Sequence, residues 1–299
     1  MECPTKVCLA SVMIILIHTV MTYDIQTIME IRQIANDETW QSRIINGYPA
    51  TEGQFPYVCQ LLIDKTTIVE MGIIREISLC TCSIISAKWV LTAGHCIMKT
   101  NASLEETVEY SIQCGSIYAD NQDPDFTRNV SESNAFRHPN YNENTLENDV
   151  GLIYISPAFD LELNSSLLTS IPINCPPNIT DFESDYLTVA GFGNIYTNDT
   201  LPTQLYWTDE LEYMNKLDCE NDWQFQALPN SSFCAWDYTT PASSICNGDS
   251  GCPIITPDII QVGIGSYGAN PCNALPQGFT DLANEDVCHW ILKRTKKGH

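Results

Sequence analysis

Short runs of β-branched and aromatic residues recur along the chain, and each is bounded by Gly, Pro, Asn or Asp. Runs of this length and composition predict strands that end in turns. They cover residues 107–114, 150–155, 186–190, 204–206 and 259–264. Because no proline-rich or glycine-serine linker and no repeat separates them, the pattern predicts one compact all-β sandwich or barrel.

The C-terminal tail carries the one convincing helical pattern. Asn284 provides an N-terminal cap, and acidic residues follow it directly. Four basic residues lie towards the C-terminal end, and the helix dipole favours both placements of charge. Val287, Trp290 and Ile291 share one face of this helix. We therefore expect a tail helix that docks on the body of the protein through these three side chains.

The N-terminus contains an apolar run at residues 7–21, directly after Lys6. The run has the length of a signal-peptide core and is short for a membrane span. We expect residues 1–22 to be removed as a signal peptide, the alternative being an uncleaved anchor. No later run is long and apolar enough to predict a membrane span.

Composition narrows the function classes. The 299 residues carry 14 Lys and Arg against 37 Asp and Glu, a net charge of −23, which disfavours nucleic acid as a partner. Fourteen cysteines without metal-binding CxxC spacing indicate disulfides and an oxidising compartment, so we expect a secreted, extracellular protein. Sequons for N-glycosylation agree with this; they begin at Asn101, Asn129, Asn164, Asn178, Asn198 and Asn230.

Three short motifs carry the candidate chemistry: LTAGHC (91–96), NDVGLI (148–153) and CNGDSGCP (246–253). Hydrolysis of an amide at neutral pH needs a nucleophilic hydroxyl, a base that takes its proton, and an acid that orients the base. Ser250, His95 and Asp149 supply these three groups. Each motif alone is a weak signal, but the three together predict a catalytic triad.

The motifs and their order, His before Asp before Ser, resemble those of the chymotrypsin-like (trypsin-fold) serine peptidases. The resemblance begins at RIINGYPA (43–50), continues through HPNYN (138–142), GFG (191–193) and SYG (266–268), and includes PQGFTDL (276–282). It implies an all-β fold of two packed six-stranded antiparallel β-barrels with a C-terminal α-helix. The peptidase domain would cover residues 44–299, with the active site between the barrels.

The resemblance also implies the role of each site residue. His95 takes the proton of Ser250 and passes it to the leaving amine, while Asp149 holds the imidazole in the required tautomer. The backbone N–H groups of Gly248 and Ser250 form the oxyanion hole. The resemblance implies no cofactor and no metal.

RIINGYPA implies an activation junction as well. Cleavage after Arg43 would free the amino group of Ile44, which would pair with Asp249 and convert a zymogen into the active form. Residues 23–43 would then be a released propeptide, because no cysteine between Cys8 and Cys59 could tether it. The alternative is that Arg43 is an ordinary exposed cation.

By the same resemblance, the specificity pocket consists of Ser244, Ile245, Gly268 and Gln277. None of these residues is acidic, so we expect cleavage after uncharged residues such as Phe, Tyr or Leu, and not after Arg or Lys. Gln277 replaces a glycine common in the family, and would narrow the pocket or favour a polar or small side chain. A one-residue shift of the alignment would place Gly278 there instead.

The resemblance pairs the cysteines as Cys80–Cys96, Cys219–Cys234 and Cys246–Cys272, and implies three further disulfides, Cys59–Cys114, Cys175–Cys288 and Cys82–Cys252. Cys82 and Cys252 each replace a glycine of the family motif, on segments that lie close together in this fold. The alternative for some of these six cysteines is a free thiol, buried as a small hydrophobic group.

Two functions remain in competition. The first is an active serine endopeptidase that works through an acyl-enzyme; the second is a catalytically silent homologue that binds a protein on the same scaffold. The intact triad favours the peptidase, and disfavours a purely structural disulfide-rich protein. Expected partners are protein or peptide substrates, an activating trypsin-like protease and protein inhibitors. We expect a monomer with no nucleic-acid or membrane partner.

Overall fold

The computed structural model describes residues 44–69, 72–100, 104–119, 123–163, 166–176, 186–193, 204–224 and 227–296. The chain divides into two units, Met1–Gln41 and Ser42–His299, and every described residue belongs to the second. The predicted signal peptide and propeptide lie outside the described residues. So do Arg43 and the sequons at Asn101, Asn164, Asn178 and Asn198.

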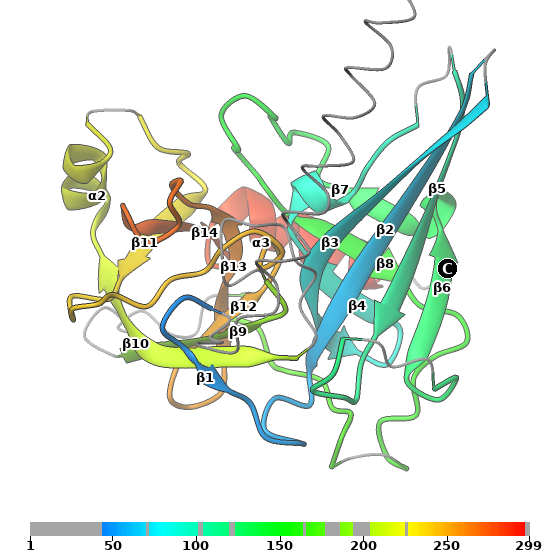
Figure 1. The fold of residues 1–299 in the computed structure, drawn as a ribbon, viewed down its shortest axis with the longest axis horizontal. Helices are drawn as coiled ribbons and strands as arrows, with labels where there is room; N and C mark the ends of the chain where they lie inside the picture. Colours follow the sequence, from blue (N-terminus) through cyan, green and yellow to red (C-terminus); the bar gives the residue numbers. More distant parts are fainter. Residues whose placement is uncertain are drawn as a thin grey trace, which may run out of the picture. The chain divides into compact units, whose positions relative to one another are not determined.

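The first half of the described chain forms a curled antiparallel sheet (Figure 1). Its strands are β2 (Val58–Val69), β3 (Gly72–Ser86), β4 (Trp89–Thr92), β5 (Glu105–Gln113), β6 (Thr127–Ser131), β7 (Ala135–Arg137) and β8 (Gly151–Tyr154). Their order is β6-β5-β2-β3-β4-β8-β7. Two short 3-10 helices, η1 (Gly94–Cys96) and η2 (Glu132–Asn134), follow β4 and β6. The chain passes from edge strand β6 to edge strand β7 through η2, so it spans the gap between the two edges.

The second half forms a closed antiparallel barrel. Its strands are β9 (Tyr186–Gly191), β10 (Tyr206–Met214), β11 (Ser232–Trp236), β12 (Pro253–Ile255), β13 (Gln261–Tyr267) and β14 (Gln277–Asp281), and β1 (Tyr48–Pro49) adds to the edge of β10. The pairing of β9 with β10 closes the ring. The expected two-barrel, trypsin-like fold is confirmed, with one barrel closed and the other a curled sheet.

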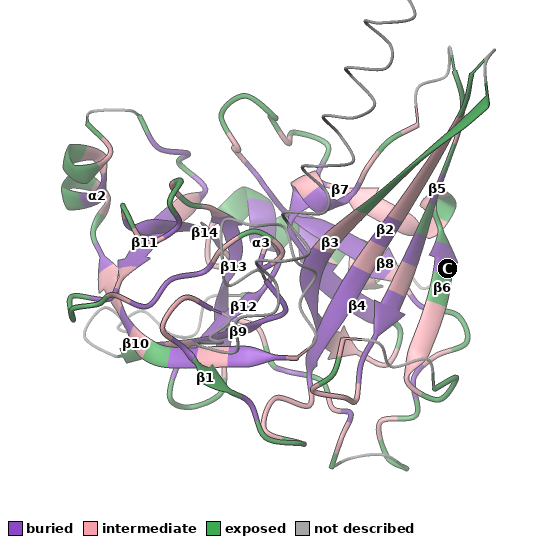
Figure 2. Cartoon of the chain, viewed as in Figure 1, coloured by how far each residue is buried: buried purple, intermediate pink, exposed green. Residues whose placement is uncertain are grey.

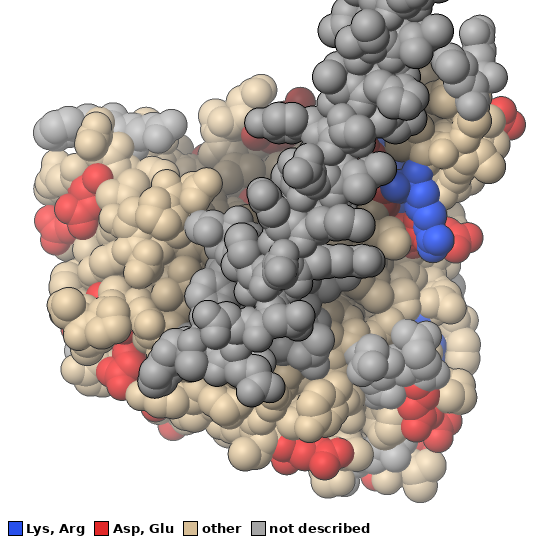
Figure 3. All heavy atoms as spheres, in the orientation of Figure 1, with Lys and Arg blue, Asp and Glu red and all other residues tan. Residues whose placement is uncertain are grey.

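Each sheet forms because alternate side chains are apolar. In β5, Val108, Tyr110 and Ile112 are buried while Glu105 and Glu109 are exposed, which is the period of two that a half-buried strand requires. The buried faces of the two sheets form two separate hydrophobic clusters (Figure 2). On the face drawn in Figure 3, acidic side chains are scattered widely and basic ones are few.

Two α-helices complete the described fold. The predicted tail helix is α3 (Glu285–Lys296); the Asn284 side chain accepts from the N–H groups of its first turn, and Val287, Trp290 and Ile291 pack into the core of the first sheet. The other helix, α2 (Lys216–Asp222), was not expected, because it is short and buries only one residue. No helix of the described chain is long and apolar enough to cross a membrane.

Five disulfides join cysteines that the sequence analysis paired: Cys59–Cys114, Cys80–Cys96, Cys175–Cys288, Cys219–Cys234 and Cys246–Cys272. The predicted Cys82–Cys252 disulfide is wrong, since both cysteines are free and fully buried. A disulfide requires two Cβ atoms that face each other. Cys82 instead packs in the core of the first sheet and Cys252 in the core of the barrel, each as a small hydrophobic side chain.

Candidate active site

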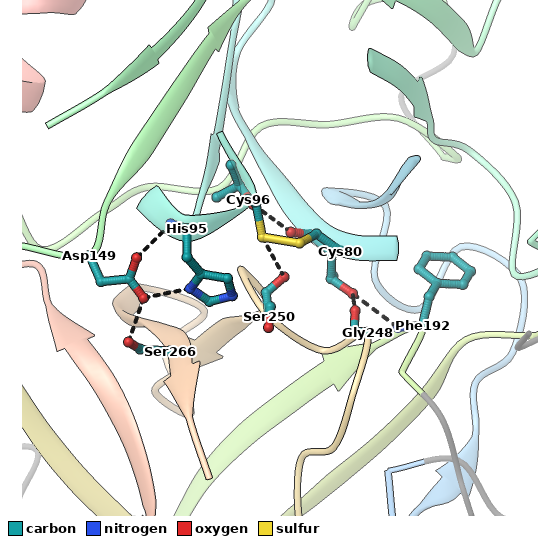
Figure 4. Close-up of a disulfide and its surroundings, with 10 residues drawn as sticks. Cys80, His95, Cys96, Asp149, Phe192, Gly248, Ser250 and Ser266 are labelled. Atoms are coloured by element: carbon teal, nitrogen blue, oxygen red, sulfur yellow. Dashed lines mark hydrogen bonds and ion pairs between the residues drawn. A yellow bond between two sulfur atoms is a disulfide. The ribbon is translucent and has the colours of Figure 1, made fainter. Parts of the chain in front are cut away.

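The three predicted catalytic residues come from three different turns. His95 lies in η1, which follows β4, and Asp149 lies two residues before β8. Because β4 and β8 are paired neighbours, the ends of these strands bring His95 and Asp149 together. Ser250 lies in the turn before β12. The imidazole of His95 lies between Asp149 on one side and Ser250 on the other (Figure 4).

Asp149 is fully buried and held by hydrogen bonds from several directions. The Nδ1–H of His95 donates to Oδ2 at 2.8 Å, and the backbone N–H of His95 donates to Oδ1 at 2.8 Å. The hydroxyl of Ser266 donates to Oδ2 at 2.6 Å, and that of Thr280 donates to the Asp149 carbonyl at 2.8 Å. This array fixes the proton on Nδ1 and leaves Nε2 as the basic nitrogen of His95.

Two opposing effects act on the pKa of His95. Burial lowers it, while the charge of Asp149 and the hydrogen bond to its carboxylate raise it. The attraction to Asp149 wins, so the pKa of His95 lies above its ordinary value. An imidazolium that forms when His95 accepts a proton is therefore stabilised in place.

The turn that carries Ser250 contains two glycines that the backbone requires. Gly248 has φ +96° and Gly251 has φ +88°, a region that residues with a Cβ rarely adopt. Thr81 fixes this turn from β3: its N–H donates to the Ser250 carbonyl at 2.8 Å and its hydroxyl donates to the Gly248 carbonyl at 3.0 Å. Among the described residues, no hydrogen bond uses the N–H of Gly248 or Ser250.

Asp249 is a fully buried carboxyl next to the candidate nucleophile. It accepts from the N–H of Gly193 at 2.7 Å and of Cys246 at 2.9 Å, and a Cβ at Gly191 or Gly193 would collide with it. Burial outweighs these two hydrogen bonds and raises the pKa of Asp249 to about 7. No cation of the described chain forms an ion pair with this carboxyl.

Ile44 lies in the core of the barrel and is fully buried. The next residue, Ile45, exchanges backbone hydrogen bonds of 2.9 and 3.1 Å with Ser244, two residues before Cys246. The segment that begins at Ile44 is thus anchored beside the same stretch of chain that holds Asp249.

A pocket of about 120 Å³ opens beside Ser250. Ile245 and Gly268 line it, together with Cys246, Asn247, Ser250, Gly265, Ser266, Tyr267, Ala269 and Cys272. No acidic residue is among these lining residues.

The other two predicted pocket residues, Ser244 and Gln277, are fully buried and do not line the pocket. The Cγ of Gln277 lies 3.9 Å from the position of a Cβ on Gly268, so its side chain stands directly behind that wall. Its Nε2 donates to the Leu275 carbonyl at 2.9 Å, while its buried Oε1 has no hydrogen-bond partner in the described structure.

Sequence reasoning missed three hydroxyl groups of this site: those of Thr81, Ser266 and Thr280. Ser266 belongs to a motif that was noticed, but nothing in SYG reveals that its hydroxyl reaches Asp149. For Thr81 the sequence offered a weak signal of a position near the active site. It lies between Cys80 and Cys82, and both cysteines were predicted to form disulfides beside that site.

The arrangement of the two sheets is that of the trypsin fold. Residues 44–291 match the family model described as Trypsin, and the chain belongs to this family. It is 32% identical to Serine protease 1 of Drosophila melanogaster over 234 residues, and this alignment covers 77% of each of the two chains. It is 28% identical over 251 residues to Chymotrypsin-2 of Vespa crabro, covering 84% of this chain and 99% of that one. The solved structure of HL collagenase superimposes with a TM-score of 0.66 at 25% identity, over 85% of this chain and all of the other. Trypsin-like proteases act on protein substrates. Membership of this family therefore supports the class of serine protease, a hydrolase, for this chain.

Proposed function

We propose that the protein is a secreted serine endopeptidase, made as a zymogen, that cleaves after uncharged residues. One observation carries this proposal: Ser266, Asp149 and His95 form a continuous hydrogen-bonded array, and Ser250 lies on the side of the imidazole away from Asp149 (Figure 4). The direct test is hydrolysis of a protein substrate by the chain after cleavage at Arg43–Ile44. If no protein or peptide is hydrolysed, the silent homologue is the correct alternative.

The reaction follows from the positions of these groups. The Ser250 hydroxyl attacks the scissile carbonyl as Nε2 of His95 takes its proton, and the N–H groups of Gly248 and Ser250 stabilise the oxyanion. His95 then returns the proton to the departing amine, which leaves an ester on Ser250. Water attacks this ester with His95 again as the base, and the acid product and the free hydroxyl result.

The zymogen proposal is supported by the charge at Asp249. A buried carboxylate without a cation is costly, and two N–H donors alone leave the pKa of Asp249 raised to about 7. In the uncut chain the nitrogen of Ile44 is a neutral amide. Cleavage after Arg43 would turn it into an ammonium group that can pair with Asp249, and this pair would fix the turn that presents Gly248 and Ser250.

Secretion is supported by the five disulfides of the structure, which form and persist in oxidising compartments. The two described sequon residues, Asn129 and Asn230, are both exposed and thus accessible to a glycan.

The size of the pocket supports a preference among uncharged residues. Its volume of about 120 Å³ is below the roughly 150 Å³ of a cavity that holds benzene. We therefore propose that residues up to the size of Leu fit before the cut and that large aromatic residues fit poorly. Arg and Lys would find no acidic partner in the lining.

Replacing Gln277 by Gly should enlarge this pocket. We expect kcat/KM for Phe and Tyr before the cut to rise at least tenfold relative to Ala and Val, because the side chain behind Gly268 is removed. A peptide library scanned with both forms measures the ratio, and the small residues serve as the internal control. An unchanged ratio would show that Gln277 does not limit the pocket, and a preference for Arg in the unaltered enzyme would contradict the pocket assignment.

The raised pKa of His95 predicts how activity depends on pH. Only the neutral imidazole can accept the Ser250 proton, so kcat/KM should fall as pH decreases through the pKa of His95. Because Asp149 holds that pKa above its ordinary value, the midpoint of this fall should lie above the roughly 6.5 of a free imidazole. A pH profile of kcat/KM on a neutral substrate measures it. A midpoint below that of a free imidazole would contradict the proposed attraction between Asp149 and the His95 imidazolium.

A further inference from the structure

The hairpin of β2 and β3 carries exposed aliphatic side chains that the core does not use. Ile68, Ile73 and Ile77 are 47%, 70% and 57% exposed. The pairing of the two strands continues without a break to Val69 and Gly72, and β5 runs beside β2 as far as Ile68, so the three strands form one outer part of the first sheet (Figure 1). Large aliphatic side chains gathered on an exposed surface indicate a contact site.

These side chains form a row that leads to the active site. Side chains alternate along a strand, so Ile73 and Ile77 lie on the same face of β3 as Leu79. Leu79 touches the nucleophile turn, because its Cδ2 lies 3.1 Å from the position of a Cβ on Gly248. Ile68 pairs with Ile73 at the far end. We call Leu79, Ile77, Ile73 and Ile68 the aliphatic row.

The row lies on the leaving-group side of the site. The specificity pocket is lined by residues 265–269, at the end of β13 in the closed barrel. With the residue before the cut in that pocket, as proposed above, the segment that follows the scissile bond runs the other way, past Gly248 of the nucleophile turn and then past Leu79 of the first sheet. The aliphatic row therefore continues the surface that a bound substrate already meets.

Charges around the row fix the chemistry of the occupant. Arg75 lies between Ile73 and Ile77 on this face, and its Nε donates to both carboxylate oxygens of Asp64 at 2.9 Å, which neutralises it. On β5, Glu105 and Glu109 share the face, since they pair with Ile68 and Asp64. An aliphatic row with acidic neighbours suits an aliphatic polypeptide segment and disfavours an anionic lipid surface.

We propose that the aliphatic row binds an aliphatic segment of a protein substrate on the leaving-group side of the scissile bond. This inference rests on the proposed function and names its substrate class as proteins or long peptides. Ile73 lies six positions before Leu79 on β3, a span of roughly 20 Å at about 3.4 Å per residue of strand. A leaving segment must therefore be about six residues long before it reaches Ile73.

On this proposal, kcat/KM should depend on the length of the leaving segment. A series of peptides tests this: all share the same residues before the scissile bond, and their leaving segments are two, five and eight residues long. The longer segments carry Ile or Leu at their far positions, and kcat/KM is measured with enzyme counted by active-site titration. We expect kcat/KM to rise about tenfold from two to eight residues, as burial of one or two aliphatic side chains would produce. The double variant Ile73→Ser/Ile77→Ser should lose this gain.

The matched control is Ile74→Ser. Ile74 is 50% exposed on the same strand but points to the opposite face, so this variant should keep the full gain. Equal length dependence in the double variant, or the same loss in Ile74→Ser, would overturn the proposal. It would also be overturned if the double substitution changed only dimerisation or binding to phosphatidylcholine vesicles.

A binding measurement separates this proposal from the proposed function. In a Ser250→Ala background, fluorescence anisotropy should show that the eight-residue peptide binds about tenfold more weakly when Ile73 and Ile77 are replaced. If the unaltered chain hydrolyses nothing while this difference in affinity persists, the proposed function fails and the binding surface stands. Equal affinity in both forms would refute the surface itself.

Discussion

Replacing Ser250 by Ala is expected to abolish peptide hydrolysis by the cut chain, with kcat falling by a factor on the order of 10⁶. Ser250 lies on the side of the imidazole away from Asp149, so its hydroxyl is the group that the array orienting His95 would activate (Figure 4). A hydroxyl in a surface pocket adds little to stability, so the variant should fold like the unaltered chain. Hydrolysis of a peptide substrate and the thermal unfolding midpoint are the two measurements.

The control for this substitution is Ser133→Ala. Ser133 is an exposed serine in η2, and its hydroxyl shares a hydrogen bond of 2.9 Å with the hydroxyl of Ser131, so activity should not change. If Ser250→Ala retained more than a small fraction of the activity, the assignment of the nucleophile would be wrong.

Replacing Asp249 by Asn is expected to lower kcat/KM of the cut chain by 100-fold or more. Asn has the same shape but cannot neutralise the ammonium group of Ile44. Removal of one partner of a buried ion pair costs about 3 to 5 kcal/mol, which corresponds to a factor of roughly 100 to 4,000. Kinetics of the chain after cleavage at Arg43–Ile44 measure the loss.

Asp237→Asn is the matched control for this prediction. Asp237 is also fully buried and also accepts from two backbone N–H groups, those of Thr239 and Ser243, at 2.7 and 2.6 Å. It has no assigned role in activation, so its replacement should affect stability and leave the response to cleavage intact. Full activity of the cut Asp249→Asn chain would show that the Ile44–Asp249 pair does not activate the site.

The sequence predicts those features of the fold that local patterns determine. The runs at 107–114, 150–155, 186–190 and 259–264 correspond to β5, β8, β9 and β13. The run at 204–206 leads into β10, which continues to Met214 with polar side chains outward. The helix α2 escaped prediction because seven residues with one buried side chain give no period to detect.

Contacts between distant segments were the part that the sequence could not supply. The hydroxyls of Ser266 and Thr81 bond to groups 117 and 167 residues away, and no local pattern reports such pairs. The error at Cys82 and Cys252 has a similar origin. The family resemblance implies that their strands are neighbours, but it does not determine towards which core each sulfur points.

The central claim is that Ser250 becomes a nucleophile only when the Arg43–Ile44 bond is cut. Treatment with a serine-directed phosphonylating probe, before and after limited trypsin cleavage, tests it directly by mass spectrometry of the peptide that contains Ser250. Covalent mass on Ser250 is expected in the cut chain, with little or none in the uncut chain. Equal labelling of both forms would contradict the zymogen, and no labelling of either would contradict the peptidase.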